Sequence, residues 1–424
     1  MLLIQNGRVI DPESNFDEIC DVLVEENHIA QIRKGIKKTA DMEVIDATGC
    51  VVAPGLVDVH VHFRDPGFTY KEDIETGAKA ALKGGYTSVV LMANTKPAVD
   101  NADTLQYVLD KGKKTDLHIY SCAAVTKSLS GKELVNMEEL LEKGAVGFTD
   151  DGIPIMDEEI MEKAMQEAAK YQVPISLHEE NPQLIANNGV NRGKASAYFL
   201  IGGSPREAES TLIARDLEIA KRTGAILNIQ HISTKEGVAL VRQAKQTKEG
   251  IHIHAEATPH HFSFTEEETI KKGTLAKMNP PLREEADRQA ILQGLQDGTI
   301  DIIATDHAPH SAEEKQRPIT EAPSGIIGLE TALSLGVMNL VDSGVLSMSR
   351  FLACMTCNPA SMYHLDCGRL QPEKTADIVI FQPDQTWKVE DFESKSANSP
   401  LLGETLKGKV LYTICNGKIA YKNS

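Results

Sequence analysis

Short apolar runs alternate with helical stretches through the middle of the chain. The runs are rich in β-branched and other apolar residues, which is typical of buried strands. Between them, stretches such as 157–171 and 286–295 have the apolar spacing of helices. Eight such repeats predict a parallel (β/α)8 barrel of the TIM type, with a doubly wound sheet as the alternative on pattern alone. The predicted strands are 56–63, 87–92, 117–123, 145–149, 174–177, 226–229, 251–255 and 301–304.

The two ends of the chain have a different pattern, in which short alternating runs are separated by turn signals. Asn-Gly and Glu-Asn pairs break the N-terminal runs, and Asn416-Gly417 separates the last two C-terminal runs as in a hairpin. Both ends therefore predict small β-sheet segments, which could form one composite domain around the central body. The runs are 2–10, 22–32, 376–381, 410–414 and 418–421.

Composition narrows the class of protein. Among 424 residues, 44 Lys and Arg face 61 Asp and Glu, a net charge of −17, which argues against nucleic acid or anionic lipid as a partner. No apolar run approaches the ~18 residues of a membrane span, and residues 1–12 lack the basic and apolar regions of a signal peptide. The seven scattered cysteines fit a reducing cytoplasm better than a disulfide framework.

The first predicted strand of the central body carries candidate metal ligands. Successive side chains of a strand point to opposite faces, so one face presents Asp58, His60, His62 and Arg64. Two imidazoles two residues apart can bind one metal ion, although a lone H-x-H fits an exposed polar face equally well. Here Asp-Pro-Gly follows and ends the strand in a tight loop, at the face where barrels keep their sites.

Other predicted strands end in the same kinds of residue. His178, His231 and Asp306 each close a strand, and Asp150 and Asp151 close another. Imidazole and carboxylate ligands suit zinc, with iron or manganese as alternatives. Four histidines and two aspartates are too many for one tetrahedral ion but suit two ions about 3.5–4 Å apart. Spacing alone does not decide between the two neighbouring aspartates, which face opposite ways.

These segments resemble a known family. H-V-H-F-R-D-P-G at 60–67 and A-T-D-H-A-P-H-x4-K at 304–315 are similar to the two signatures of the dihydroorotases, within the amidohydrolase superfamily. The chain is most similar to the bacterial type that has an aspartate in place of a carboxylated lysine. The resemblance covers almost the whole chain, through N-x-K-P at 94–97, T-D-D-G at 149–152, T-P-H-H at 258–261, M-N-P-P-L-R at 278–283, G-L-E-T at 328–331 and N-P-A at 358–360.

The resemblance implies a metal-dependent (β/α)8 barrel at 53–365 and a β-sandwich built from 1–52 and 366–424. It also implies the reversible cyclisation of N-carbamoyl-L-aspartate to L-dihydroorotate and water, the third step of de novo pyrimidine synthesis. The expected partner is this small-molecule substrate. The resemblance leaves open whether the chain forms a homo-oligomer or associates with another enzyme of the pathway.

The resemblance also implies roles for single residues. His60, His62 and Asp306 would hold one zinc ion, and His178 and His231 the other, with Asp151 between them; one ion per subunit is the alternative to two. Asp306 would also act as general acid and base. Substrate contacts are implied for His62, Phe63, Arg64, Asn94, Asn279, His310, Ser324 and Gly325, the last two through their backbone.

Two other functions compete with this interpretation. Hydantoinases and allantoinases are related cyclic amidases, but they usually have a lysine at the bridging position, and their substrates need no carboxylate contact from Arg64. A catalytically inactive relative could serve as a scaffold for another pyrimidine enzyme. Such proteins lose metal ligands, whereas every expected ligand position is filled here.

Several further motifs have a structural interpretation. His252 and His254 form a second H-x-H on the seventh predicted strand, and both could face the barrel as ligands or ligand supports. His260, His261 and His307 are expected to structure loops. Cys354 and Cys357 form a lone C-x-x-C in a helical stretch, for which core packing is favoured over zinc binding. The loop 307–324 is expected to move over the substrate.

Overall fold

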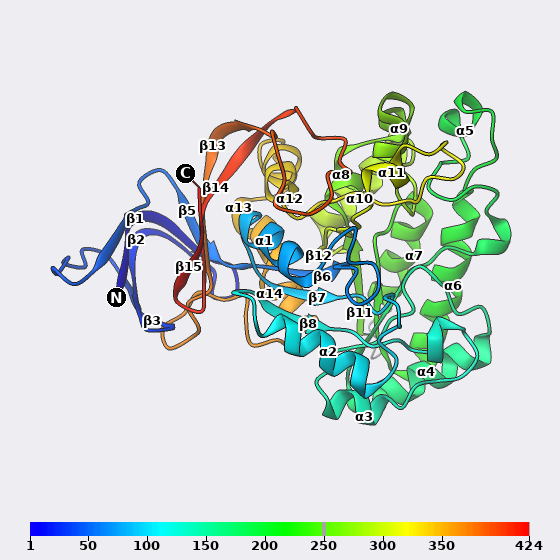
Figure 1. Cartoon of the computed structure of the whole chain (residues 1–424), viewed down its shortest axis with the longest axis horizontal. Helices are drawn as coiled ribbons and strands as arrows, with labels where there is room; N and C mark the ends of the chain where they lie inside the picture. The colour runs from blue at the N-terminus through cyan, green and yellow to red at the C-terminus, as the bar shows by residue number, and fades with distance from the viewer. Residues whose placement is uncertain (248–251, 424) are drawn as a thin grey trace.

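The computed structural model describes residues 1–247 and 252–423, which divide into a sheet-rich end and a larger α/β body (Figure 1). The sheet-rich end holds both termini, and its eight-stranded sheet has the order β15-β14-β13-β5-β1-β2-β3, with β4 beside β1. The sheet joins the two ends of the chain where β5 pairs antiparallel with β13. Its strands are β1 (Leu2–Asp11), β2 (Phe16–Glu25), β3 (His28–Arg33), β4 (Glu43–Asp46), β5 (Val51–Pro54), β13 (Ile378–Lys388), β14 (Thr405–Cys415) and β15 (Lys418–Lys422).

Of the two Asn-Gly pairs that predict turns in this sheet, one lies in a turn and the other does not. Asn416 and Gly417 both have positive φ and join β14 to β15, which confirms the predicted hairpin. The turn predicted at Asn6-Gly7 is wrong, because the pair lies inside β1, where the register with β2 shifts. A Cβ at Gly7 would lie 2.4 Å from Cγ2 of Val52, so the glycine at this bulge lets β5 approach β1 closely.

The body contains parallel strands in two groups, β6-β7-β8 and β12-β11-β10-β9. Phe148 bridges Ala123, just after β8, to Ile175 of β9, and His307, after β12, bridges Val61 of β6. Every residue of β6, β7, β9 and β10 is buried, as expected of parallel strands that are covered on both faces. The strands are β6 (Leu56–Val61), β7 (Tyr86–Leu91), β8 (His118–Ser121), β9 (Pro174–Leu177), β10 (Ile226–Ile229), β11 (His252–Ala257) and β12 (Ile302–Ile303).

The strand predictions for the body hold with one exception. The predictions at 174–177 and 226–229 match β9 and β10, whereas the predicted start of β11 at Ile251 lies outside the described residues. The exception is the segment predicted at 145–149, which pairs with both neighbouring strands only through the isolated bridges of Phe148. Its backbone still bonds to both sides, because Thr149 donates to the carbonyl of Ala123 (2.9 Å) and Phe148 donates to that of Pro174 (3.1 Å).

Helices separate the strands of the body. The predicted helix at 157–171 is confirmed as α4, and Asp157 caps it by accepting hydrogen bonds from the backbone of Glu159 and Ile160. The helix predicted at 286–295 is α10. The helices are α1 (Ile74–Lys83), α2 (Ala102–Gly112), α3 (Met137–Glu142), α4 (Glu158–Tyr171), α5 (Lys194–Tyr198), α6 (Arg206–Thr223), α7 (Lys235–Gln246), α8 (Pro259–Ser263), α9 (Glu266–Lys272), α10 (Glu285–Asp297), α11 (Ala312–Lys315), α12 (Ala332–Gly336), α13 (Met348–Met355) and α14 (Cys357–Met362). Across the described ranges, no helix combines the length and apolar character needed to cross a membrane.

Candidate metal centre

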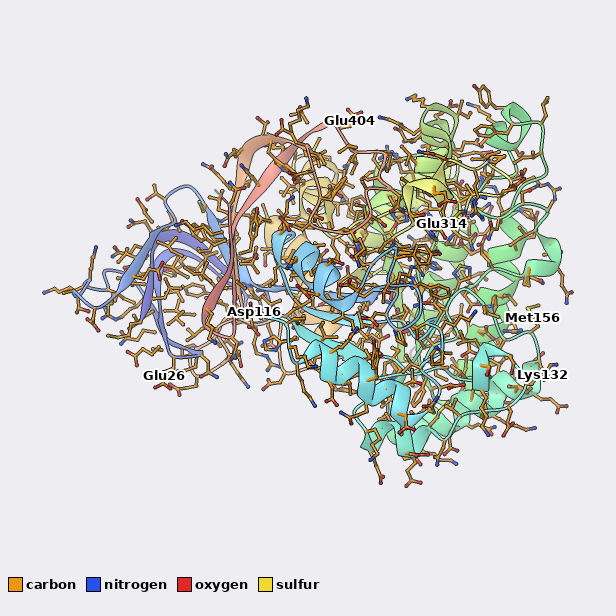
Figure 2. All side chains as sticks on the ribbon, in the orientation of Figure 1. Glu26, Asp116, Lys132, Met156, Glu314 and Glu404 are labelled. Carbon is orange, nitrogen blue, oxygen red and sulfur yellow. The ribbon has the colours of Figure 1, made fainter. Side chains whose placement is uncertain are left out.

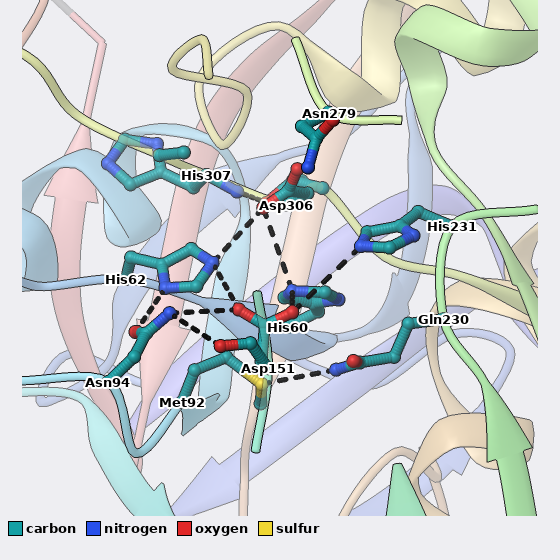
Figure 3. A network of polar contacts seen from close by, with 12 residues as sticks. His60, His62, Met92, Asn94, Asp151, Gln230, His231, Asn279, Asp306 and His307 are labelled. Carbon is teal, nitrogen blue, oxygen red and sulfur yellow. Dashed lines mark hydrogen bonds and ion pairs between the residues drawn. The ribbon is translucent and has the colours of Figure 1, made fainter. Parts of the chain in front are cut away.

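The predicted ligands meet at the carboxyl ends of the parallel strands, where Figure 3 shows most of them around Asp151. His60 lies near the end of β6 and His62 just after it, His178 directly follows β9, His231 lies two residues after β10, and Asp306 follows β12. All of these side chains are buried. Alternation along β6 and the shared strand edge therefore bring together residues that lie far apart in the sequence.

The first group of possible ligands contains His60, His62 and Asp151. His60 Nε2 lies 3.5 Å from Asp151 Oδ1, and His62 Nε2 lies 3.4 Å from Asp151 Oδ2. Asp306 Oδ1 lies 3.1 Å from His62 Nε2 and 3.6 Å from His60 Nε2. The ligand atoms of the first three residues are close enough together to hold one metal ion, with Asp306 beside them.

The second group shares Asp151 with the first and adds His178 and His231. Asp151 Oδ1 lies 3.7 Å from His178 Nδ1 and 3.9 Å from His231 Nε2. The two imidazole nitrogens are 2.9 Å apart. This group could hold another ion, so Asp151 is the carboxylate common to both groups.

The centre has the properties of a metal site. In the described part of the chain, His60 Nε2 and Asp151 Oδ1 are buried without a hydrogen-bond partner, which is costly for polar atoms. Both atoms belong to the possible ligand groups, and a cation between them would satisfy them. Imidazole nitrogens and carboxylate oxygens are the donors that zinc, iron and manganese accept. The residues therefore fit a metal ion in each group.

Electrostatics keeps the bridging carboxylate ionised. Burial alone would raise the pKa of Asp151, but the imidazoles of His60 and His62 outweigh it and hold that pKa well below its usual value. Burial and the neighbouring His178 lower the pKa of His231 well below its ordinary value. His231 is therefore neutral, which is the form of imidazole that binds metals.

Asp150, the neighbour of Asp151, binds the backbone of another segment instead of lying among the histidines. Its Oδ1 accepts hydrogen bonds from the backbone nitrogens of Val125 (2.8 Å) and Thr126 (3.1 Å), which fixes the segment that follows β8. Of the two aspartates that the sequence could not separate by spacing, Asp151 is the one that lies among the histidines.

Asn94 connects two of the candidate ligands. Its Oδ1 accepts a hydrogen bond from His62 Nδ1 (2.9 Å), and its Nδ2 donates to Asp151 Oδ2 (3.0 Å). The first bond places the His62 proton on Nδ1 and leaves Nε2 free for a ligand. The side chain that sequence analysis assigned to substrate contact thus also orients two residues of the centre.

Two buried glutamates support the centre, and sequence analysis missed both. Glu256 Oε2 accepts a hydrogen bond from His60 Nδ1 (3.0 Å), and Glu180 Oε2 lies 3.5 Å from His178 Nε2. Both carboxylates lie on the side of the imidazole opposite its ligand atom, and Glu256 orients the ring of His60 through its hydrogen bond. A signal existed for Glu256, because alternation places it on the same face of β11 as His252 and His254.

The predicted substrate-contact residues border the centre on the side of loop 307–324. Arg64 Nε donates to the carbonyl of Pro309 (3.3 Å), and His310 Nε2 donates to the carbonyl of Ser324 (2.8 Å). Gly325 has a φ of 128°, and a Cβ there would lie 2.7 Å from that of Ala308. Arg64 thus lies beside Pro309, and His310 connects this part of the loop to Ser324, which precedes Gly325.

Asn279 and Phe63 are placed differently from each other. Asn279 Nδ2 lies 3.2 Å from His178 Nε2, so this amide reaches the centre directly. The buried ring of Phe63 packs edge-on against the ring of His307 and also fills the space beside Gly77 of α1. Its side chain belongs to the core, which leaves only the backbone of Phe63 for a substrate contact.

The backbone of the centre contains three residues in a sparsely populated conformation. Arg64, His231 and Asp306 have φ values of 58°, 32° and 48°, in the left-handed region that non-glycine residues rarely adopt. Such conformations persist where surrounding contacts impose them, and they cluster at functional sites. Two of the three residues, His231 and Asp306, are themselves candidate ligands.

The histidines outside the predicted centre have structural contacts. His261 bonds to Thr258 Oγ1 (2.8 Å) and donates to the carbonyl of Pro280 (3.0 Å), and His307 Nε2 lies 3.4 Å from Glu72 Oε2. His254 Nδ1 lies 2.8 Å from Asp301 Oδ2, and His252 is exposed. Both residues of this H-x-H lie at the amino end of β11, away from the centre, so neither is a ligand or a ligand support there.

Comparisons with known proteins extend over the whole chain. Residues 51–420 match the model of the amidohydrolase family. A dihydroorotase of Clostridioides difficile is 54% identical over 421 residues, with 99% of this chain and all of that protein covered. A dihydroorotase of Clostridium acetobutylicum is 51% identical, with both chains covered completely.

Solved structures agree with this assignment at the level of the fold. An L-hydantoinase (dihydropyrimidinase) from Arthrobacter aurescens has a TM-score of 0.89 at 25% identity, covering 100% of this chain and 96% of its own. A D-hydantoinase (dihydropyrimidinase) from Thermus sp. has a TM-score of 0.85 at 24% identity, covering 100% and 95%. The resemblance stated from the sequence is confirmed, and this chain belongs to the amidohydrolase family.

Proposed function

We propose that the chain is a dihydroorotase, which interconverts N-carbamoyl-L-aspartate and L-dihydroorotate in pyrimidine synthesis. The observation that carries this proposal is the full-length similarity, at 48–54% identity, to curated relatives named dihydroorotase. The expected partner is the small-molecule substrate. A cytoplasmic location stays a prediction from the cysteines, all seven of which are free thiols.

The proposed architecture is a (β/α)8 TIM-type barrel at 53–365 with a β-sandwich domain formed by 1–52 and 366–424. The bridges of Phe148 and His307 support closure of the parallel strands into one ring, with 145–149 as the short remaining segment. The mixed sheet of both chain ends supports the second domain. The catalytic centre then lies at the carboxyl ends of the barrel strands, where such barrels bind their substrates.

We infer that the centre takes two zinc ions, one held by His60, His62 and Asp306 and one by His178 and His231, with Asp151 between them. The unpartnered ligand atoms of His60 and Asp151 support this assignment. When bound, such ions lower the pKa of a shared water and polarise the substrate carbonyl. Glu256 and Glu180 hold the imidazoles of His60 and His178 in the orientation that this binding needs.

Asp306 is the proposed general acid and base. Its carboxylate lies beside His62, among the candidate ligands, where the attacking water must be. In ring opening it accepts the proton of that water and passes it to the leaving ring nitrogen. In ring closure it accepts a proton from the carbamoyl nitrogen, and such transfers contribute about 10²–10⁴-fold to the rate.

Arg64 is the proposed contact for the substrate carboxylate. A guanidinium binds a carboxylate through two parallel hydrogen bonds, and Arg64 supplies local positive charge in a protein of net charge −17. Only its Nε has a hydrogen-bond partner among the described residues. Asn279, His310 and the Ser324-Gly325 backbone border the same space and would contact the rest of the substrate, as would Asn94, His62 and the backbone of Phe63.

The alternative is a hydantoinase, which the names of the similar solved structures favour. A direct test assays the purified protein with dihydroorotate, hydantoin and allantoin side by side, together with Arg64→Lys and Arg64→Met. We expect turnover of dihydroorotate alone, weaker binding in Arg64→Lys and a larger loss in Arg64→Met. Turnover of hydantoin with both variants unimpaired would favour the alternative, and a protein without zinc or turnover would be a scaffold.

The bridging residue gives a second test. The nearest preceding lysine, Lys143, is exposed at the end of α3 and lies before the segment that carries Asp151. We therefore expect metal-depleted protein to regain activity with zinc alone in buffer purged of carbon dioxide. A strict bicarbonate requirement, with full activity in Asp151→Ala, would mean that a carboxylated lysine is the bridge.

A further inference from the structure

A separate cluster of potential ligands lies where the eight-stranded sheet meets the body. His118 is the first residue of β8, Asp377 directly precedes β13, and Cys415 is the last residue of β14. One ligand atom of each lies within 4.8 Å of the other two. Figure 2 labels Asp116, two residues before His118, at this border between sheet and body.

Two of the three donors are already arranged as in a metal site. His118 Nε2 lies 3.1 Å from each carboxylate oxygen of Asp377, and two donors on a tetrahedral zinc ion are separated by roughly 3.3 Å. The backbone of Asn416 donates to Asp377 Oδ1 (2.8 Å) and fixes this carboxylate. The thiol of Cys415 lies beside Asp377 and makes a weak contact with the carbonyl of Thr87 (3.7 Å), so it lies within reach of the pair.

The cluster is open to solvent on one side. Asp377 and Cys415 are buried, whereas about a third of the His118 side chain is exposed (32%). A surface cleft of about 520 Å³ borders it, lined in part by Asp116, His118, Cys415 and Lys418. Three protein donors with one side open to water match the usual four-coordinate arrangement of zinc. Because Lys418 also lines the cleft, a cation there must be held by direct ligation rather than by general negative charge.

We propose that His118, Asp377 and Cys415 form a second metal site, independent of the catalytic centre and selective for soft divalent ions of the zinc class. A sulfur, a nitrogen and an oxygen donor favour zinc or cadmium over magnesium or calcium. The site joins β8 of the body to the two C-terminal strands of the sheet. An ion bound there crosslinks segments far apart in the sequence and stabilises the folded chain by mass action. It lies at the amino end of β8, opposite the strand ends that hold the catalytic centre.

Cadmium distinguishes this site from the catalytic centre, because a cadmium–thiolate bond has an ultraviolet charge-transfer band and the catalytic centre contains no cysteine. We would titrate the full-length protein with cadmium and follow this band in four proteins: the parent, Cys415→Ser, His118→Gln and Cys357→Ser. Glutamine keeps a donor toward Asp377 but cannot act as an imidazole ligand. Cys357, a half-buried thiol in α14, provides the matched control.

We expect a saturating band of one equivalent in the parent and in Cys357→Ser. The band should be absent in Cys415→Ser, and His118→Gln should bind cadmium about 10-fold more weakly or worse. No band in the parent, a full band in Cys415→Ser, or an unchanged midpoint in His118→Gln would each overturn the proposal. Circular dichroism confirms that each variant is folded, and the partly exposed position of His118 makes His118→Gln the least disruptive of them.

Discussion

The two ends of the parallel strands carry the same residue types and use them differently. At the carboxyl ends, His60-x-His62 is buried beside Asp151 and Asp306. At the amino end of β11, His252-x-His254 has one exposed imidazole and one paired with Asp301. The function of an H-x-H motif therefore depends on its position along the strand, because only at the carboxyl ends do residues from several strands meet in one buried centre.

Glu256 shows the same dependence on position within a single strand. It lies on the face of β11 that also carries His252 and His254, yet it alone reaches the catalytic end and bonds to His60. Glu256 lies two residues after His254 and four after His252, and each residue of a strand spans about 3.3 Å. This short distance separates the residues near the surface from a buried residue that supports the centre. The predictions below test this contrast, from the largest expected effect to the smallest.

Removal of a candidate ligand should have the largest effect. His231→Ala should lose metal and nearly all dihydroorotate turnover, because no other described residue takes its place beside His178. His252→Ala, at the other end of the neighbouring strand, is the matched control and should retain both. For both variants we would measure the metal content by mass spectrometry, the turnover of dihydroorotate and the melting temperature. Full activity in His231→Ala would contradict the two-metal assignment.

Asp306→Asn tests the proton transfer. The amide keeps the shape of the carboxylate but cannot accept the proton, so kcat should fall by about 10²–10⁴-fold while KM changes little. Steady-state kinetics in both directions measures this split. A variant in which only KM changes would speak against the general base. Asp301→Asn, which removes the carboxylate charge at the opposite strand end, should leave kcat unchanged.

Glu256→Gln tests whether the support from β11 matters. Glutamine retains an acceptor for His60 Nδ1 but loses the charge, and changes of this kind typically cost about 10–100-fold in metal affinity or activity. Glu256→Ala should cost more, because it removes the acceptor as well. Metal affinity is measured by competition with a chelator. Parent-like affinity in both variants would mean that His60 is oriented by packing alone.

Sequence patterns predicted the strands and helices of the body well, because burial of parallel strands and caps such as Asp157 are local properties. They were less successful where tertiary pairing decides the structure. Asn6-Gly7 has the composition of a turn, but the pairing of β1 with both β2 and β5 turns it into a bulge. The segment 145–149 bonds to both neighbouring strands, as the pattern predicted, but it bridges each of them only at Phe148.

For the site, alternation along β6 and the shared position of strand ends were enough to bring the candidate ligands together. What these rules could not provide is the direction of a side chain after a strand ends. Asp150 and Asp151 are adjacent and chemically identical, and only the three-dimensional contacts with Val125 and Thr126 separate them. Glu256 was missed because its function depends on a partner from another strand, and Glu180 because it lies beyond the end of β9, where alternation no longer applies.

Lysines at the two ends of the parallel strands differ in their partners, and this difference predicts that stability depends on pH. At the amino ends, Lys245 pairs with Asp301 (3.2 Å). In the loop over the carboxyl ends, buried Lys315 has no ion pair with a carboxylate in the described part of the chain and donates to the carbonyls of Pro323 (2.9 Å) and Gly325 (3.0 Å). Burial and the nearby Lys277 lower the pKa of Lys315 to about 7. The folded state then releases a proton that the unfolded chain keeps up to a pKa near 10.4.

Stability should therefore rise with pH above about 7, and Lys315→Met should lose that part of the rise. Between pH 7 and 9 the unfolding free energy of the parent should rise by roughly 2 kcal/mol more than that of Lys315→Met. Urea unfolding of both proteins at the two pH values measures it. Equal slopes would mean that Lys315 stays protonated in the folded protein. Lys245→Met, at the other end, is the control that should leave the slope unchanged.

The smallest effect is expected for His254→Gln. The imidazole bonds to Asp301 at the solvent-exposed edge, and partly exposed pairs of this kind contribute about 0.2–1 kcal/mol. Glutamine can still donate to the carboxylate, so the unfolding free energy should fall by no more than that amount. Turnover and metal content should equal those of the parent, in contrast to the loss expected for a ligand on β6. A fall in metal affinity in His254→Gln would contradict the contrast between the two strand ends. It would mean that a change at the amino end of β11 alters the centre through Glu256.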